Sequence, residues 1–231
     1  MQKELIFKKF TNYIKDGNFL LHSNDNKDKR YKLNSHGYRT QEFDDIDWEN
    51  AVVIFGCSNV YGVGLEEDET ICSQLSKEIN RPVVNMGIPG SSMQYSLYNS
   101  VILNEFYPTP HSVVQIWTMP ERTVEFSRYN VHQYGTWNIE KNSYMDLWSK
   151  SKTNVDVSAL FCSMISKQIW ESKTNYTEIS FFPKTSYLLK CDFIRTIDVA
   201  RDNLHPGVQT AKKTALKIKE NLSKNLTNNN N

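Results

Sequence analysis

The chain of 231 residues is long enough for one sizeable domain and short for two. Hydrophobic residues make up 39% and charged residues 23% of it, a globular balance that excludes a largely disordered chain. The formal net charge of +1, from 27 basic and 26 acidic side chains, demands no polyanion-binding face, so we expect no nucleic acid partner.

The N-terminal residues 1–17 place apolar side chains at helical spacing among lysines and predict an amphipathic helix. They lack the apolar stretch and the small-residue cleavage site of a signal peptide. No apolar run approaches the roughly 18 residues of a membrane span. The four cysteines have no zinc-like spacing, so we interpret them as reduced thiols. These features predict a cytoplasmic protein that binds neither a membrane nor a metal.

The chain is predicted to carry one domain over residues 50–225. Residues 1–49 are expected to form an extension packed on this domain, and the Asn-rich residues 226–231 a disordered tail. Residues 120–150 are aromatic and polar without a clean period. We predict there a long segment without regular structure, which is usually functional or mobile.

From residue 51 onward, short apolar runs alternate with stretches of helical spacing. The predicted strands are 51–55, 82–86, 112–117 and 177–182, and the predicted helices are 67–79, 91–106, 154–172 and 206–222. Such alternation predicts a mostly parallel sheet with helices on both faces, and we expect the strand 51–55 to lie between the strands 82–86 and 112–117. Ligands of such sheets bind at the carboxyl ends of the strands. We therefore expect the catalytic or ligand-binding residues in the loops at that edge.

Ser58 follows the first predicted strand and can begin the next turn, where unpaired backbone N–H groups favour a negative charge. A serine hydroxyl is a weak nucleophile until a base takes its proton. Asp202 and His205 lie three residues apart in the loop before the last helix, so one helical turn would bring both to the same side. A carboxylate that orients an imidazole toward a serine is the arrangement of a Ser–His–Asp triad.

These blocks together resemble the conserved blocks of the SGNH/GDSL hydrolases. The resembling stretches, in chain order, are Leu33–Arg39, Gly56–Gly64, Asn85–Gly90 and Asp202–Gly207. The resemblance implies a three-layer α/β/α sandwich with a short parallel sheet of flavodoxin-like strand order. It also implies an esterase that cleaves acyl esters.

The resemblance assigns a role to each site residue. Ser58 would be the nucleophile, His205 the base and Asp202 the group that orients it, while the N–H groups of Ser58 and Gly90 would form the oxyanion hole. No metal and no organic cofactor is implied. The expected partner is a small-molecule or glycan ester, with a small acyl group on a carbohydrate favoured and lipid esters and thioesters left open.

Two positions depart from the family pattern. Cys57 stands where the first block has an aspartate, which is not the nucleophile. After the third strand the family has Gly-x-Asn, whose asparagine donates to the oxyanion, but here no asparagine follows. Loss of one such donor typically costs ~10²–10³ in rate. We predict that Thr118 lies nearest the oxyanion position, with Arg122 as the second choice.

Several interpretations stay open at this point. Ser58 could be only a helix cap, and His205 only a surface histidine. An acyltransferase would use the same triad with a sugar hydroxyl in place of water, and a silent binding module could have kept the fold without the chemistry. Gly87 is assigned to a tight turn and Arg39 to a structural salt bridge. The sequence leaves the acyl group, the alcohol, the oligomeric state and the role of residues 120–150 undecided.

Overall fold

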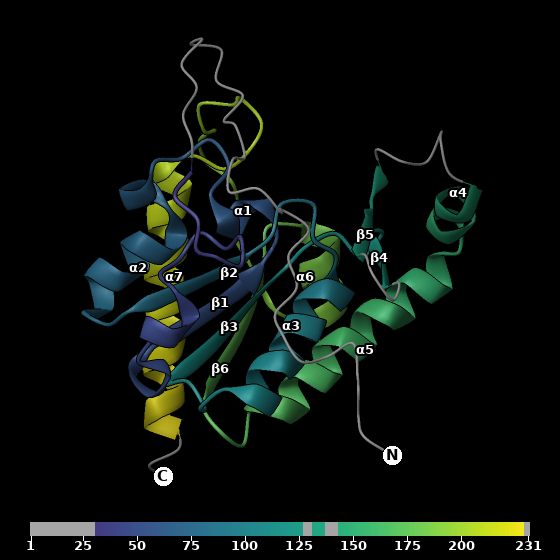
Figure 1. Cartoon of the computed structure of the whole chain (residues 1–231). Coiled ribbons are helices and arrows are strands. Elements are labelled where there is room, and N and C mark those ends of the chain that lie inside the picture. Colours follow the sequence, from purple (N-terminus) through teal and green to yellow (C-terminus); the bar gives the residue numbers. More distant parts are fainter. Residues whose placement is uncertain (1–30, 127–130, 137–142, 229–231) are drawn as a thin grey trace.

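A five-stranded sheet forms the centre of the computed structural model, which describes residues 31–126, 131–136 and 143–228 (Figure 1). The strands are β1 (Val52–Gly56), β2 (Val83–Gly87), β3 (Ser112–Trp117), β6 (Asn175–Ser180) and β7 (Asp192–Phe193). Their order is β2-β1-β3-β6-β7, and all neighbours are parallel. This is the flavodoxin-like order. The predicted parallel sheet is confirmed, and so is the place of the strand 51–55 between the strands 82–86 and 112–117.

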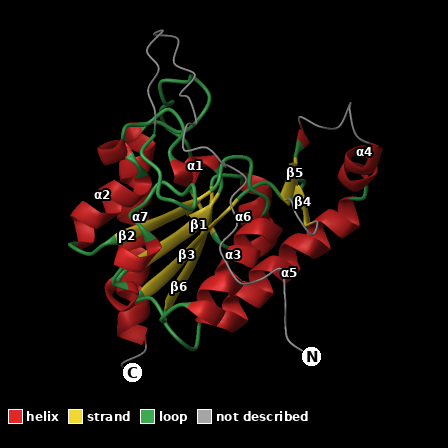
Figure 2. Ribbon diagram, viewed as in Figure 1, coloured by secondary structure: helices red, strands yellow, loops and turns green. Residues whose placement is uncertain are grey.

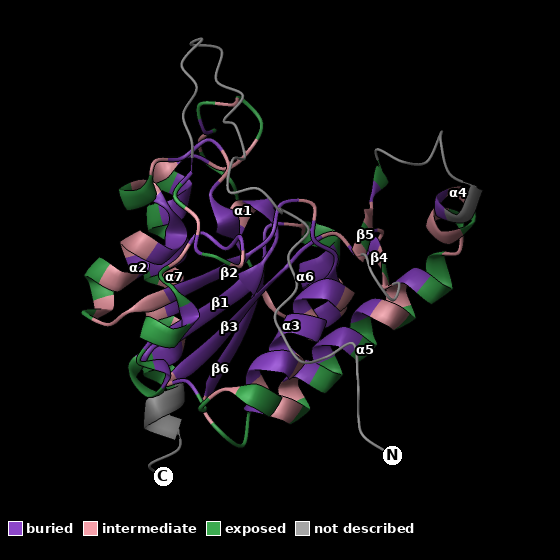
Figure 3. Cartoon of the chain, viewed as in Figure 1, coloured by how far each residue is buried: buried purple, intermediate pink, exposed green. Residues whose placement is uncertain are grey.

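Helices cover both faces of the sheet and complete three layers (Figure 2). One face carries α1 (Ser58–Tyr61), α2 (Ile71–Ile79) and α7 (Val208–Asn228), and the other carries α3 (Met93–Phe106), α5 (Lys152–Trp170) and α6 (Pro183–Leu189). Side chains of β1 alternate between the two cores, with Val53 and Phe55 toward α3 and Val52 and Ile54 toward α2 and α7. Burial on both faces explains why the strands read as continuous apolar runs (Figure 3).

The register of the inner strands brings their carboxyl ends to one edge. Gly56, the last residue of β1, lies opposite Gly87 of β2 and Ile116 of β3. The three loops that follow these strands therefore leave the sheet side by side.

Helix starts follow the capping signals of the sequence. Ser92 caps α3, because its side chain accepts a hydrogen bond from the N–H of Tyr95. The helix predicted at 67–79 begins later than expected, because a short 3-10 turn at Glu67–Glu69 precedes Thr70, the cap of α2.

The prediction of an irregular segment at 120–150 was wrong for its described part. This part contains an antiparallel hairpin of β4 (Thr123–Phe126) and β5 (Val131–Tyr134), followed by α4 (Ser143–Lys150). Phe126 packs on α3, with ring centroids 5.8 Å from Tyr95 and 4.7 Å from Tyr98. Residues 127–130 and 137–142 of the segment lie outside the described residues.

Residues ahead of β1 contribute to the core. Tyr38, Phe43, Ile46 and Trp48 are buried in the cluster on the α3 face. The amphipathic helix expected at 1–17 lies outside the described residues. At the other end, α7 continues to Asn228, so the predicted start of a tail at 226 falls inside this helix.

Two further expectations from the sequence were reduced cysteines and no membrane-spanning helix. All four cysteines are free thiols. No helix in the described part of the chain combines the length and the apolar character that crossing a bilayer requires.

Candidate active site

Ser58 is the first residue of α1 and lies directly beyond the carboxyl end of β1. The side chain is buried, and its hydroxyl donates to Sγ of Cys57 across 4.0 Å. The N–H of Ser58 has no intramolecular acceptor among the described residues, since it precedes the first closed turn of the helix. A buried serine with an unpaired N–H beside it can both attack a carbonyl and help to hold the resulting oxyanion.

Two residues of β2 fix the position of α1. Asn85 is buried, donates from Nδ2 to the carbonyl of Val60 at 3.0 Å and accepts from the N–H of Gly87 at 3.0 Å. A Cβ on Gly87 would lie 2.3 Å from the backbone nitrogen of Tyr61. The assignment of Gly87 to a turn was therefore wrong. This glycine ends a strand, and its lack of a side chain lets α1 pack directly on β2.

Gly90 lies in the loop after β2, at the same edge as Ser58. Its φ of +75° is in the left-handed region that favours glycine, and the turn is closed by the N–H of Ser91 donating to the carbonyl of Ile88 at 3.0 Å. Within the described ranges, the N–H of Gly90 donates to no protein acceptor. Like the N–H of Ser58, it is free to bind an oxyanion.

Asp202 and His205 form a hydrogen-bonded pair. Oδ2 of Asp202 bonds Nδ1 of His205, while Oδ1 accepts the N–H groups of Leu204 at 3.2 Å and His205 at 3.1 Å. Burial raises the pKa of Asp202, but the hydrogen bonds from His205 and Leu204 outweigh it and lower the pKa below its ordinary value. With Nδ1 engaged, Nε2 is the imidazole nitrogen left to act as a base.

The backbone that brings this pair together is not helical. Asn203 adopts a φ of +58°, and the N–H of Ala200 donates to the carbonyl of His205 at 2.7 Å, which closes a turn. The helical turn proposed for Asp202 and His205 was therefore wrong in its geometry. Asp202 and His205 meet at a spacing of three residues because the Asp202 carboxylate accepts the backbone N–H groups of Leu204 and His205 and so closes the turn between them.

The loop of Ser58 and the loop of His205 touch through Gly64. A Cβ on Gly64 would lie 2.9 Å from Oδ1 of Asp202, and the N–H of Arg201 donates to the carbonyl of Gly64 at 3.4 Å. Ser58 and His205 themselves share no hydrogen bond in the described structure. Catalytic hydrogen bonds often tighten only when substrate binds. The predicted contact of their side chains stays a prediction.

Thr118 and Arg122 both reach this edge from the loop after β3. Thr118 lies two residues beyond Ile116, as Ser58 lies two beyond its neighbour Gly56. The Thr118 hydroxyl is buried and meets no hydrogen-bond partner in the described part of the chain. Arg122 donates from Nη1 to the carbonyl of Ser91 at 3.4 Å, next to Gly90. Their role toward an oxyanion remains a prediction.

Arg39 has the structural role that was expected. The guanidinium is buried and donates to the carbonyls of Tyr61, Gly62 and Leu65, while Nε pairs with Glu67 at 2.7 Å. Arg39 thus holds the turn that follows α1.

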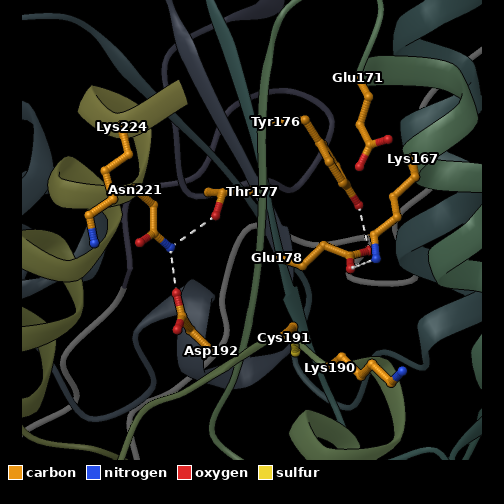
Figure 4. Close-up of a pocket in the computed structure, with 10 residues that line it drawn as sticks. All are labelled: Lys167, Glu171, Tyr176, Thr177, Glu178, Lys190, Cys191, Asp192, Asn221 and Lys224. Atoms are coloured by element: carbon orange, nitrogen blue, oxygen red, sulfur yellow. Dashed lines mark hydrogen bonds and ion pairs between the residues drawn. The ribbon is translucent and has the colours of Figure 1, made fainter. Parts of the chain in front are cut away.

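A second polar cluster lies away from this edge and was not predicted. Buried Glu178 of β6 accepts from Trp117 at 2.9 Å, Tyr176 at 2.8 Å and Ser163 at 2.8 Å, and pairs with Lys167 at 3.0 Å. The cluster borders a pocket of about 390 Å³ between α5 and α7 (Figure 4). Long-range pairing of this kind leaves no local pattern in the sequence. Because these polar groups satisfy one another, we assign the cluster to structure rather than to catalysis.

Across the described residues, no group of three or more His, Cys, Asp or Glu side chains is placed to hold a metal ion.

The sequence matches no protein-family model and no curated protein. Among solved structures the chain is similar to the esterase EstA from Pseudoalteromonas sp., with 11% identity and a TM-score of 0.48, over 77% of this chain and 99% of that one. A lipase/acylhydrolase from Enterococcus faecalis shows 14% identity and a TM-score of 0.46, over 76% and 96%. The acetyl xylan esterase Est2A from Butyrivibrio proteoclasticus shows 9% and 0.48, over 81% and 66%. Such low similarity transfers no activity, so the chemistry must follow from this chain's own residues.

Proposed function

We propose that the chain is a serine esterase of the SGNH/GDSL type, with Ser58 as nucleophile and His205 as base. The observation that carries this proposal is the Asp202–His205 pair, whose loop touches the turn that follows Ser58. A carboxylate-bound imidazole next to a serine loop is the arrangement that activates a hydroxyl.

The proposed reaction has two halves. Nε2 of His205 takes the proton of the Ser58 hydroxyl as Oγ attacks the ester carbonyl, and Asp202 stabilises the imidazolium that forms. The tetrahedral intermediate collapses to an acyl-serine, and His205 returns the proton to the departing alcohol. Water, deprotonated by His205, then attacks the acyl-serine, and His205 returns that proton to Oγ of Ser58 as the acid leaves.

The negative charge of the intermediate requires donors that are already in place. The unpaired N–H groups of Ser58 and Gly90 supply two of them. We propose the Thr118 hydroxyl as a third, because it is an unpaired buried donor in the loop after β3.

The proposed substrate is an ester of a small acyl group with a carbohydrate hydroxyl, as the sequence resemblance implied. Release of acetate from acetylated sugars, compared with hydrolysis of nitrophenyl esters of increasing chain length, tests this choice. Faster cleavage of long-chain esters than of sugar acetates would contradict it.

Covalent labelling tests the serine mechanism directly. A fluorophosphonate probe is expected to label the wild-type protein at Ser58, and mass spectrometry of the labelled peptide identifies the residue. Ser58→Ala should lose both labelling and ester hydrolysis, whereas Cys57→Ala, a change at the neighbouring buried residue, should keep labelling. Wild-type protein that neither reacts with the probe nor cleaves esters would instead support a binding module.

The same assay with an acceptor sugar separates hydrolysis from transfer. We expect free acid as the main product with and without acceptor. Acylated sugar as the main product would make the protein an acyltransferase with the same triad.

A further inference from the structure

The loop that carries Asp202 and His205 is tied to the loop of Ser58 by one arginine. Arg201 immediately precedes Asp202 in the chain. Both its backbone N–H, at 3.4 Å, and Nη1 of its guanidinium, at 3.3 Å, donate to the carbonyl of Gly64. The guanidinium also forms a two-pronged ion pair with Glu69, with 2.7 Å between Nη2 and Oε1. These contacts join residues that lie more than 130 positions apart in the sequence.

The turn that Arg201 contacts is also held by other hydrogen bonds. Arg39 donates hydrogen bonds to its carbonyls at Tyr61, Gly62 and Leu65. The N–H of Gly64 donates to the Tyr31 hydroxyl at 2.9 Å. Arg201 donates to a further carbonyl of this turn, that of Gly64. The turn is therefore fixed to Ser58 on one side and can serve as a reference point for the His205 loop on the other.

Gly64 lets the two loops approach closely. Its φ is +80°, and a Cβ there would lie 2.8 Å from Cβ of Ala200 and 2.9 Å from Oδ1 of Asp202. A side chain at this position would push the loop of Asp202 and His205 away from the turn that follows α1.

We infer that Arg201 is a positioning residue, which sets the distance between His205 and Ser58 by clamping the His205 loop to Gly64 and Glu69. The inference rests on the proposed function, since it assigns Arg201 to the same triad. A bidentate guanidinium suits this task because its planar fork fixes direction as well as distance. Displacement of a catalytic group by about 1 Å can cost about 100-fold in rate.

The variants Arg201→Ala and Arg201→Lys test the clamp, with Lys219→Ala as the matched control. Lys219 also forms an ion pair between distant elements, at 3.0 Å to Glu78, with both side chains about as exposed as that of Arg201. We expect Arg201→Ala to lower kcat by roughly tenfold to a hundredfold with KM within about twofold. Arg201→Lys should lie between it and wild type, because lysine keeps the charge but not the fork. Lys219→Ala should match wild type.

Two further measurements distinguish positioning from a general structural role. Millimolar guanidinium should restore part of the lost kcat of Arg201→Ala and none of that of Ser58→Ala. The low-field proton resonance of the imidazole Nδ1–H, held by Asp202, should shift or broaden in Arg201→Ala and stay unchanged in Lys219→Ala.

The outcomes separate the two proposals. Wild-type kcat and an unchanged Nδ1–H resonance in both Arg201 variants would overturn the clamp. So would an equal loss of kcat in Lys219→Ala. Failure of wild type to react with the fluorophosphonate would overturn the esterase instead, and the resonance would still decide whether Arg201 sets the geometry of the Asp202–His205 pair. Should Arg201→Ala fail to fold, Arg201→Lys carries the test.

Discussion

Asp202 is the side chain on which the acid–base pair depends. One carboxylate oxygen holds the His205 ring and the other accepts two backbone N–H groups, so the charge is surrounded by donors. The same carboxylate closes the turn of its own loop. A change at Asp202 therefore affects the orientation of the imidazole and the shape of the loop together.

Asp202→Asn should show this coupling in the pH dependence of stability. The folded-state pKa of Asp202 lies below its ordinary value of 3.8, so the unfolded chain takes up this proton first as the pH falls. The stabilisation from Asp202 is therefore complete above about pH 4 and is lost as the pH falls through the folded pKa. Urea unfolding of both proteins should give a difference that shrinks as the pH falls below about 4. A difference that grows as the pH falls through this range would contradict this account.

Thr118→Val tests the third oxyanion donor. The hydroxyl is buried without a partner, and such a group costs roughly 1–3 kcal/mol of stability. Valine keeps the shape, so the variant should unfold at equal or higher urea concentration. If the hydroxyl donates to the oxyanion, kcat for ester cleavage should fall, by up to roughly 10²–10³. Greater stability with an unchanged kcat would leave Thr118 as a buried polar group only.

The helix that carries Ser58, α1, depends on close packing of its backbone against β2. The helix α1 has a single turn and touches β2 where Gly87 has no side chain. Asn85 of the same strand binds the carbonyl of Val60. The position of Ser58 therefore follows from β2 as much as from β1.

Gly87→Ala should displace α1 as a unit. The added Cβ would meet backbone atoms of Val60 and Tyr61, which cannot rotate away as a flexible side chain would. Overpacking of this kind costs typically about 1–3 kcal/mol. We expect a lower urea midpoint and a lower kcat, because Ser58 moves with its helix. A variant that lost neither would show that α1 can shift without consequence.

The inner strands could be predicted from the sequence because burial on both faces leaves continuous apolar runs. The ranges 51–55, 82–86 and 112–117 fall within one residue of β1, β2 and β3. The fourth predicted strand, 177–182, begins two residues late, because β6 starts with the polar residue Asn175. The β4–β5 hairpin, α6 and β7 are short, and their stability comes from contacts with distant elements, which no local period records.

Some residues at the candidate site could likewise be predicted from local sequence, and others could not. The Asp202–His205 pair and the place of Ser58 directly after β1 could be predicted from short blocks of sequence. Gly64, Arg201 and Glu69 could not, because their contacts connect two loops that only the folded sheet brings together. The left-handed backbone conformation of Asn203 could likewise not be predicted from the spacing of Asp202 and His205 alone.

Across the whole molecule, a buried polar cluster ties the sheet to the helices on the α3 and α5 face. Glu178 lies in β6 and gathers Trp117 from β3 and Ser163 from α5. Burial, and after it the neighbouring Glu178 carboxylate, raises the pKa of Tyr176 well above its ordinary value. Glu178 therefore links three elements on one face of the fold.

Glu178→Ala should be strongly destabilising, by roughly 3–5 kcal/mol, because it leaves several buried donors without an acceptor. Lys167→Met should cost much less, since the Lys167 side chain is 37% exposed and the carboxylate keeps its other donors. Thermal unfolding of both variants, at about 2–4 °C per kcal/mol, measures the contrast. Equal losses would mean that the ion pair matters more than the neutral hydrogen bonds.

The shortness of β7 has a consequence for solubility. This strand pairs with only Ile179 and Ser180, so among the described strands none covers the outer edge of β6 before them. An unpaired strand edge can form hydrogen bonds with a strand from another molecule. Lysines at such an edge disfavour this pairing, because it would bury their charge. Lys167, Lys190 and Lys224 border this edge (Figure 4). A strand from a second molecule that paired here would have to bury these charges, so we expect the edge to resist such pairing.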